Sequence, residues 1–257
     1  MTTSLGRYLG AALAGSVFLG GALTATGSVA VVPASAATVI TTIPVGNSPT
    51  AISSDGTHVW TANFGDNTVT EINASTGSVV QTIPVGSHPG SVSSDGTHVW
   101  VDLGNGSNAP FGQTLVELDA STGALVQNIF NPGFGDGGVS SDGTHVWLSN
   151  FNSGTVTEFD ASTGAFIQSI SVGIFTHNAW SDGTHVWVSL PAQGYITELD
   201  ASTGAFVQNI PITFGNQNGV MSDGTHVWVS SYASPAGVIE LNASDGSVVQ
   251  TLSLIHI

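Results

Sequence analysis

Short runs rich in Val, Ile, Thr and Trp, bounded by turn residues, fill the chain beyond residue 48. The first unit holds four such runs, at residues 49–53, 57–62, 67–72 and 78–84. Runs of this length and composition predict β-strands, and no apolar stripe with a 3.6-residue period indicates a helix in this region. We name the four predicted strands A to D in chain order.

Turn residues separate these predicted strands. Asp55 and Gly56 lie between strands A and B, and residues 73–77, Asn-Ala-Ser-Thr-Gly, lie between strands C and D. Glycine accepts positive φ, and an Asp or Asn side chain can accept hydrogen bonds from its own turn. The pattern therefore predicts two tight turns in each unit.

The unit is repeated along the chain. The heptapeptide Ser-Asp-Gly-Thr-His-Val-Trp occurs five times, at intervals of 40, 47, 40 and 41 residues, beginning at Ser54, Ser94, Ser141, Ser181 and Ser222. A second block follows each copy and begins at Glu71, Glu117, Glu158, Glu198 and Glu240. Units of about 40 residues with four strands are typical of propeller blades. We predict an all-β propeller of four-stranded blades, five of them visible in residues 37–251.

Apolar residues on both faces of strand B indicate how the blades pack. Val59 adjoins Trp60, and the same pair recurs in every unit. Neighbouring blades would cover both faces, and each Trp would then bury on the order of 200 Å², worth a few kcal/mol at about 25 cal/mol per Å². Trp180 and Met221 replace the residue equivalent to Ser53, and we expect both to fill the core.

A histidine begins strand B in every unit, at His58, His98, His145, His185 and His226. Repetition in each blade favours a structural hydrogen bond over five catalytic sites. The strand C glutamates have no Lys or Arg after Arg7 to pair with, and an unpaired buried carboxylate is costly. We therefore expect a His–Glu contact in each blade.

The sequence of residues 55–86, which runs from Asp-Gly-Thr-His-Val-Trp to Ile-Pro-Val-Gly, resembles the YVTN family of β-propeller repeats. The resemblance covers nearly all of residues 37–251, although Trp60 stands where the family usually has Tyr. It implies a secreted or cell-surface propeller, often of seven blades, related in fold to the virginiamycin B lyase-like propellers. No catalytic residue of those lyases is carried to a matching position here.

Strand D sequences outnumber the other strands. Residues 38–46 repeat the strand D sequence of residues 78–86, although the fifth unit has a strand D start of its own. We therefore expect at least one blade to be missing, so that the sequence is a truncated part of a propeller of about seven blades. Residues 252–257 depart from the repeat and are interpreted as a non-native tail.

The first 36 residues indicate export. Arg7 precedes an apolar stretch at residues 9–32, and Ala34-Ser35-Ala36 fits a cleavage site. We predict a secretory signal peptide at residues 1–36, a secreted or cell-surface protein, and no membrane insertion after cleavage. The alternative is an uncleaved membrane anchor, because the stretch is long enough to span a bilayer.

The chain is strongly acidic. The sequence contains seventeen acidic residues and one basic residue, so its formal net charge is −16. It contains no cysteine. Nucleic acid and anionic membrane surfaces are unfavourable partners, because binding phosphate requires clustered Lys and Arg. Disulfides cannot contribute to stability.

The B–C and D–A loops vary among the units, whereas the A–B and C–D turns are nearly identical. Both sets of variable loops lie at one end of a propeller, which we call the variable face, and loops on a rigid scaffold are common binding elements. Aromatic residues among Asn, Gln and Asp there suit a glycan, a cell-wall component or a protein ligand. The candidate residues are Phe64, Asp66, His88, Asp102, Asn105, Phe134, Asp136, Phe151, Phe175, His177, Asn178, Phe214, Asn216 and Tyr232. The alternative is that these are Gly-rich loops with aromatic plugs and no ligand.

Three acidic residues stand outside the repeat: Asp66, Asp102 and Asp136. Convergent carboxylates could bind Ca²⁺ or Mg²⁺, although no ligand spacing of a known motif occurs and solvated acids are the alternative. We expect no other cofactor. His177 with Asp136 or Asp102 would be the acid–base and metal pair of a lyase or hydrolase. This metal-assisted enzyme is the alternative to the binding module, and the chain lacks a nucleophile elbow, a phosphate loop and a His-Glu-x-x-His motif.

Overall fold

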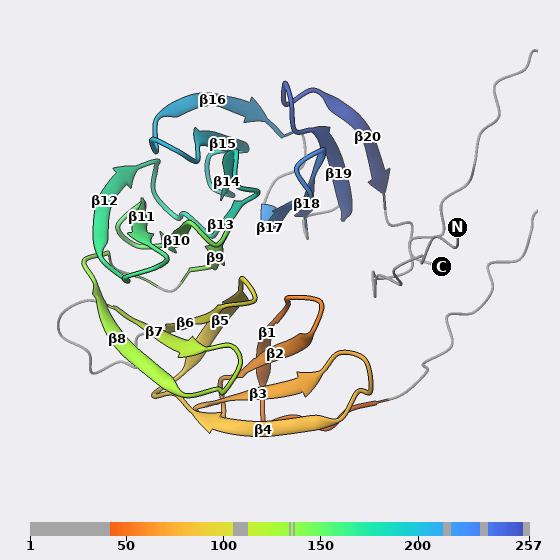
Figure 1. Cartoon of the computed structure of the whole chain (residues 1–257). Helices are drawn as coiled ribbons and strands as arrows, with labels where there is room; N and C mark the ends of the chain where they lie inside the picture. Colours follow the sequence, from red (N-terminus) through yellow and green to blue (C-terminus); the bar gives the residue numbers. More distant parts are fainter. Residues whose placement is uncertain are drawn as a thin grey trace, which may run out of the picture. The chain divides into compact units, whose positions relative to one another are not determined.

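The computed structural model describes residues 42–104, 113–133, 135, 137–212, 217–231 and 236–253. In this part of the chain twenty strands form five antiparallel sheets, each with its four strands in chain order. The five sheets follow one another as blades around a central axis (Figure 1). The predicted all-β propeller with five four-stranded blades is confirmed. No helix among the described residues is long and apolar enough to cross a membrane.

Each blade contains strands A to D of one unit. Blade 1 consists of β1 (Pro49–Ser54), β2 (His58–Asn63), β3 (Thr68–Asn73) and β4 (Val79–Pro84). Blade 2 consists of β5 (Pro89–Ser94), β6 (His98–Leu103), β7 (Gln113–Asp119) and β8 (Leu125–Asn131). Blade 3 consists of β9 (Val139–Ser141), β10 (His145–Asn150), β11 (Thr155–Asp160) and β12 (Phe166–Ser171).

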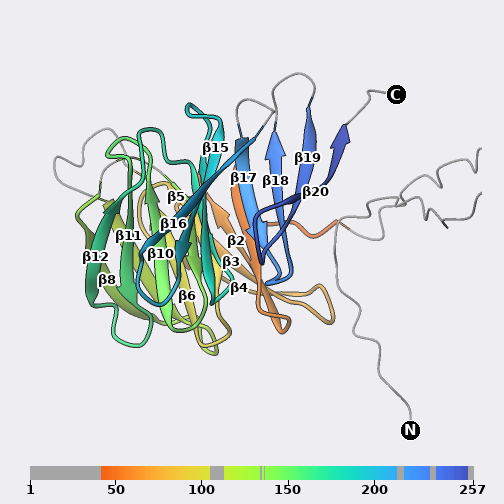
Figure 2. The ribbon, with the colours of Figure 1, turned by 90° about the horizontal axis from the view of Figure 1, so that it is seen from above.

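The last two blades repeat this order. Blade 4 consists of β13 (Asn178–Ser181), β14 (His185–Leu190), β15 (Tyr195–Asp200) and β16 (Phe206–Pro211). Blade 5 consists of β17 (Gln217–Ser222), β18 (His226–Ser231), β19 (Gly237–Asn242) and β20 (Val248–Ser253). The bounds in blade 1 lie within one residue of those predicted from the sequence. Figure 2 shows the blades from a second side, with the connections between strands at the two ends of each blade.

The predicted turns form as the side chains require. Asp55 Oδ1 accepts hydrogen bonds from the backbone N–H groups of Thr57 and His58, at 2.8 and 2.7 Å, and Gly56 has a φ of 88°. In the C–D turn of blade 2, Asp119 Oδ1 accepts from the hydroxyls and the backbone N–H groups of Ser121 and Thr122. The two hydroxyl bonds are the largest cause that lowers the pKa of Asp119 to about 2.

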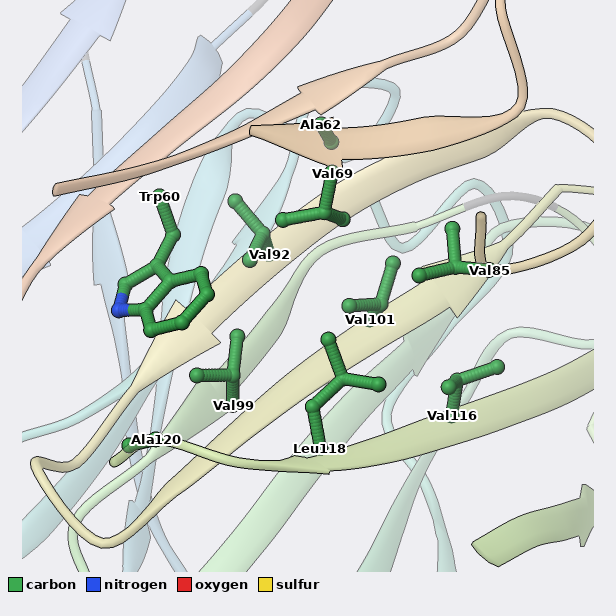
Figure 3. Close-up of a cluster of buried hydrophobic side chains, with 10 residues drawn as sticks. All are labelled: Trp60, Ala62, Val69, Val85, Val92, Val99, Val101, Val116, Leu118 and Ala120. Atoms are coloured by element: carbon green, nitrogen blue, oxygen red, sulfur yellow. The ribbon is translucent and has the colours of Figure 1, made fainter. Parts of the chain in front are cut away.

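Consecutive blades pack face to face through apolar side chains. We call the side of a blade that meets the next blade its leading face, which in blade 1 carries Trp60 and Val69, and the opposite side its trailing face, which in blade 2 carries Val99 and Leu118. Figure 3 shows these two faces in contact. The leading-face tryptophans of blades 1 to 4 have no exposed surface, as predicted: Trp60, Trp100, Trp147 and Trp187. Trp228 of blade 5 is only half-buried, because no described blade covers its leading face.

A carboxylate in the A–B turn also links neighbouring blades. Asp95 Oδ2 accepts from Trp100 Nε1 at 3.1 Å and from the Ser141 hydroxyl of the next blade at 2.7 Å. Burial acts to raise the pKa of Asp95, but hydrogen bonds from His98, Ser141 and other donors hold the pKa below its usual value. We call this arrangement of turn Asp and next-blade Ser the interblade latch. It recurs between the other consecutive blades, at Asp55 with Ser94, Asp142 with Ser181 and Asp182 with Ser222.

The predicted His–Glu contact is confirmed in all five blades, with Nε2–Oε1 distances of 3.5 to 3.6 Å. The second glutamate oxygen has a partner as well. In blade 2, Glu117 Oε2 accepts from Gln127 Nε2 at 2.7 Å, and the same amide donates to the carbonyl of Thr163 in blade 3 at 3.0 Å. The buried carboxylate is therefore compensated within its blade without any Lys or Arg.

The two unusual residues of strand A differ in burial. Trp180 is half-buried against the core of blade 5 and donates from Nε1 to the Ser222 carbonyl at 3.0 Å, so the prediction for Trp180 is confirmed. The prediction for Met221 is wrong, because its side chain is 49% exposed. Met221 pairs with Trp228 in register and lies on the leading face of blade 5, where no described blade follows.

Candidate functional site

The B–C and D–A connections lie at one end of the antiparallel strands, on the variable face. Eight of the candidate residues fall in the described part of the chain: Phe64, Asp66, His88, Asp102, Phe151, Phe175, His177 and Asn178. The other six lie outside the described residues: Asn105, Phe134, Asp136, Phe214, Asn216 and Tyr232.

The first aromatic pair joins blades 1 and 2. Phe64 follows β2, His88 precedes β5, and their ring centroids lie 4.7 Å apart with an interplanar angle of 47°. His88 has a φ of 56°, and its N–H donates to Asn67 Oδ1 at 2.8 Å. Its ring atom Nδ1 is buried with no hydrogen-bond partner among the described residues. Phe64 is 38% exposed, so part of the pair faces solvent.

A second aromatic cluster joins blades 3 and 4. Phe151 follows β10, and its ring centroid lies 5.1 Å from Phe175 and 6.1 Å from His177, the latter in an edge-on arrangement. The Phe175 N–H donates to the Phe151 carbonyl at 3.0 Å. Phe175 is 42% exposed and has a φ of 61°, a conformation that costs a bulky residue about 1–3 kcal/mol. Strain of this kind accumulates at functional sites.

The surroundings of His177 disfavour the charged form of its ring. Burial is the main cause that lowers its pKa below the usual value, and a hydrogen bond with the backbone of Asn218 acts in the opposite direction. Among the described residues, no Asp or Glu lies within ion-pair distance of His177. The predicted pairing with Asp136 falls outside the described residues.

The candidate metal ligands occupy different settings. Asp66 accepts from the backbone N–H and the side-chain amide of Asn47, both at 2.7 Å, and these two bonds lower its pKa. Asp102 has no exposed surface, and Asp136 lies outside the described residues. In the described part of the chain, no three His, Asp or Glu side chains are close enough to hold a metal ion. Calcium or magnesium binding stays a prediction.

Buried amides beneath the variable face were not anticipated from the sequence. Asn63 Nδ2 donates to the Thr70 hydroxyl at 2.8 Å, and Asn150 Nδ2 donates to the Thr157 hydroxyl at 2.9 Å. Asn150 also accepts from Asn131 Nδ2 at 2.6 Å, which joins the end of one blade to the next. The sequence does show Asn at the end of strand B in two units only. It does not show the hydrogen-bond partners of these amides, which come from strands C and D.

Asn178 lies close to the second aromatic cluster. Its N–H donates to the Ser189 hydroxyl at 3.1 Å, and its Oδ1 is buried with no partner among the described residues. A Cβ at Gly138 would lie 2.7 Å from Asn178 Nδ2, so a side chain there would displace this amide. The structure therefore brings Phe151, Phe175, His177 and Asn178 into one region, and it places Phe64 and His88 between another pair of blades.

The family of the chain follows from this architecture and from its sequence. A family model described as outer membrane protein assembly factor BamB matches residues 22–210. The chain belongs to the BamB family. This assignment supports the prediction of a β-propeller repeat family. It does not support the narrower assignment to the YVTN family.

Solved structures of two proteins share the fold. Hydrazine synthase of Kuenenia stuttgartiensis is similar with a TM-score of 0.61 and 16% identity, over 82% of this chain and 68% of that chain. BamB from Moraxella catarrhalis is similar with a TM-score of 0.57 and 17% identity, over 81% of this chain and 63% of that chain. No curated protein matches the sequence. At these identities the likeness shows the propeller fold alone.

Proposed function

We propose that this protein is a binding module of the cell envelope or cell surface that holds a protein ligand on its variable face. The observation that carries the proposal is the pair of aromatic clusters, each formed by loops of two neighbouring blades and partly exposed at Phe64 and Phe175. Aromatic side chains are enriched in the cores of protein interfaces. The BamB family is described as an assembly factor, which supports a protein ligand over a small substrate.

A photo-crosslinking amino acid placed at Phe64, and separately at Phe175, tests this proposal in envelope extracts. The matched control carries the same probe at Thr57, which is exposed in the A–B turn at the opposite end of the blades. We expect one protein to be crosslinked from both variable-face positions and not from Thr57. Phe151→Ala should weaken the crosslink from Phe175 by about tenfold, the effect of losing an aromatic anchor worth ~1–2 kcal/mol.

Other outcomes would contradict the proposal. Equal crosslinking from Thr57 would show nonspecific contact. Binding to purified glycans or cell-wall fragments that Phe64→Ala and Phe175→Ala abolish, without a crosslinked protein, would assign the variable face to a carbohydrate instead.

The enzyme alternative rests on His177. Its lowered pKa suits a general base, but no described carboxylate lies beside it to orient the ring or hold a metal ion. The test is an assay of the protein on a panel of substrates. A metal-dependent lyase would lose its activity when a chelator is added and when His177 is changed to Ala. Such a loss would favour the enzyme over the binding module.

The proposal also covers the export of the chain and the YVTN character of its repeat. We infer that residues 1–36 direct the chain across the membrane and that its unit is a YVTN-type variant of the BamB-like propeller. The acidic, cysteine-free composition is compatible with this setting. N-terminal sequencing of the mature protein is the measurement, with Ala37 as the expected first residue, and an intact Met1 would contradict export by cleavage.

A further inference from the structure

The outer strand of every blade is a sheet edge. Strand D is the last strand of its sheet and lies on the outside of the ring, as β4, β8, β12, β16 and β20 (Figure 1). A sheet edge presents backbone N–H and C=O groups that can pair with another strand, and proteins commonly protect it with charged side chains or proline. None of these five strands contains a charged residue. The outer strands therefore differ in protection only through proline and through their other side chains.

The least protected of these edges is β8 in blade 2. It has seven residues, whereas the other four outer strands have six. Its residue Phe130 is 62% exposed. The residues at this position in the other blades are Pro84, Ser171, Pro211 and Ser253. Proline blocks pairing at the edges of blades 1 and 4, whereas β8 keeps its backbone donor there and adds an exposed ring.

The backbone of Phe130 points away from its own sheet. Pro84 pairs with Thr68 in the register that Phe130 has with Thr114. The next residue, Val85, donates its N–H to the carbonyl of the strand C side at 3.1 Å, so residue 84 lies at a position where strand C receives no hydrogen bond. By this equivalence the N–H and C=O of Phe130 are directed outward, where a further strand could pair with them.

One face of β8 is fixed to blade 3. Gln127 Nε2 donates to the Thr163 carbonyl at 3.0 Å, and Asn131 Nδ2 donates to Asn150 Oδ1 at 2.6 Å. Between them, Ile129 is buried in the core that blades 2 and 3 share. The edge is therefore held in one position, and a strand that pairs with it would not have to order it first.

The other face of β8 is exposed and mainly apolar. Val126, Asn128 and Phe130 alternate along it, and all three are exposed. Leu125 is exposed as well, because the register shifts opposite Leu118 and breaks the alternation. Side chains of a neighbouring strand lie beside those of the edge strand, so apolar residues on an added strand would pack on Val126 and Phe130.

Charge indicates what kind of strand would bind. Asp119 lies in the turn that leads into β8, and its Oδ1 accepts four hydrogen bonds from that turn, which leaves Oδ2 without a hydrogen bond among the described residues. The sequence has no Lys or Arg after Arg7, and its formal net charge is −16. A second copy of the chain would be repelled by this charge, whereas a basic segment would be attracted.

We propose that β8 binds an extended segment of a partner protein, with alternating apolar and basic residues, as a fifth strand of blade 2. The apolar side chains of this segment pack on Val126 and Phe130, and a Lys or Arg lies beside Asp119. In strand addition of this kind, backbone hydrogen bonds provide affinity and alternate side chains provide specificity. The site lies on the outside of the ring and is distinct from the aromatic clusters of the variable face.

The test is the binding of a fluorescent peptide of alternating valine and lysine, matched in length to β8, to the full chain, measured by anisotropy. Two control peptides keep part of its chemistry: one alternates valine and glutamate, and one has the same valines and lysines in two separate blocks. We expect only the alternating valine–lysine peptide to bind. At saturation it should slow hydrogen exchange of the outward amides of β8 about tenfold and leave those of β12 unchanged.

Three variants of the chain locate the site, and each takes a residue that another blade already holds at that position. Phe130→Pro, the residue of blades 1 and 4, should weaken binding about tenfold or more. Phe130→Ser, the residue of blade 3, should weaken it about tenfold, whereas Phe206→Ser removes an equally exposed ring from β16 and should have little effect. Asp119→Asn, the residue of blades 1 and 5, should weaken binding roughly two- to threefold and reduce its salt dependence.

Several results would overturn the proposal. They include no binding of the valine–lysine peptide, equal binding of either control peptide, and equal losses from Phe130→Ser and Phe206→Ser. A dimer of the full chain that Phe130→Pro dissociates would assign this edge to a second copy instead. Binding to uncharged phosphatidylcholine vesicles that Phe130→Ser abolishes, without binding of the peptide, would assign it to lipid.

Discussion

At the residue scale, the turn aspartates serve both the turn and the neighbouring blade. One carboxylate oxygen of Asp95 holds the backbone of its own turn, and the other joins Trp100 to Ser141 of the next blade. A carboxylate can accept several hydrogen bonds at once, so a single side chain closes a hairpin and fixes where the next blade packs. The repetition of this residue along the chain therefore reflects packing between blades as well as turn formation.

Asp95→Asn should lower the free energy of unfolding by about 1–3 kcal/mol, because an amide nitrogen would face the Trp100 and Ser141 donors. Chemical denaturation is the measurement. Asp223→Asn is the matched control, since Asp223 receives hydrogen bonds only from its own turn among the described residues. Equal losses in the two variants would contradict a role for the interblade latch.

Stability should fall in acid because the folded state lowers the pKa of the aspartates. The pKa of Asp55, Asp95 and Asp182 lies below the reference value of 3.8, and that of Asp119 falls to about 2. A carboxyl with a lowered folded-state pKa contributes stability that is complete above its unfolded pKa and disappears as pH falls through the folded pKa. The melting temperature should therefore decline from about pH 4 towards pH 2. A melting temperature that stays constant across this range would be inconsistent with the prediction.

At the scale of elements, the C–D turns of blades 2 to 5 pack against strand D of the preceding blade. Gly164 has a φ of 69°, and a Cβ there would lie 2.5 Å from both Gln127 Nε2 and Ile129 Cδ1. Gln127 cannot move freely, because its amide donates to Glu117 and to the Thr163 carbonyl. The glycine is thus required by both the turn and the contact between blades.

Gly164→Ala should therefore destabilise the protein more than Gly56→Ala. Both glycines have positive φ, so alanine costs about 1–2 kcal/mol of backbone strain at each. Gly56 has open space around the added Cβ, whereas at Gly164 the displaced Gln127 should add roughly 1–2 kcal/mol. Equilibrium denaturation of the two variants gives the difference, and equal values would exclude a packing role for the C–D turn.

At the scale of the whole molecule, burial is uneven around the ring. Strand C of blade 4 is buried at four successive positions, from Ile196 to Leu199, because it has a blade on each side. Strand C of blade 5 alternates between buried and half-buried positions from Gly237 to Asn242, because only its trailing face is covered. One sequence pattern therefore gives different burial according to its place in the ring.

Hydrogen exchange should follow this difference. Amide protons of β14 and β15 should exchange about tenfold more slowly than those of β18 and β19, because opening blade 5 breaks one interface and opening blade 4 breaks two. Exchange measured by mass spectrometry on the native protein gives the comparison. Uniform protection across the five blades would contradict this prediction.

The sequence was informative wherever a feature repeats and acts locally. Strand bounds, the turns at Asp55 and Asp119 and the His–Glu contact all follow from neighbours within one or two strands. The candidate site was predictable only in part. The sequence indicated the loops that carry Phe64 and Phe175, but not that His88 would be the ring beside Phe64, or that Asn47 would occupy both oxygens of Asp66.

By itself, the sequence determined the blade, because hydrogen bonding between adjacent strands and the chemistry of tight turns depend on residues close together in the chain. Only the tertiary structure decided which faces of the blades are covered and which loops meet. Met221 shows the difference: its apolar character and its position in strand A predict burial, yet its exposure depends on whether a further blade lies against it. Burial is a property of contacts between distant segments, so a local pattern can favour burial without determining it.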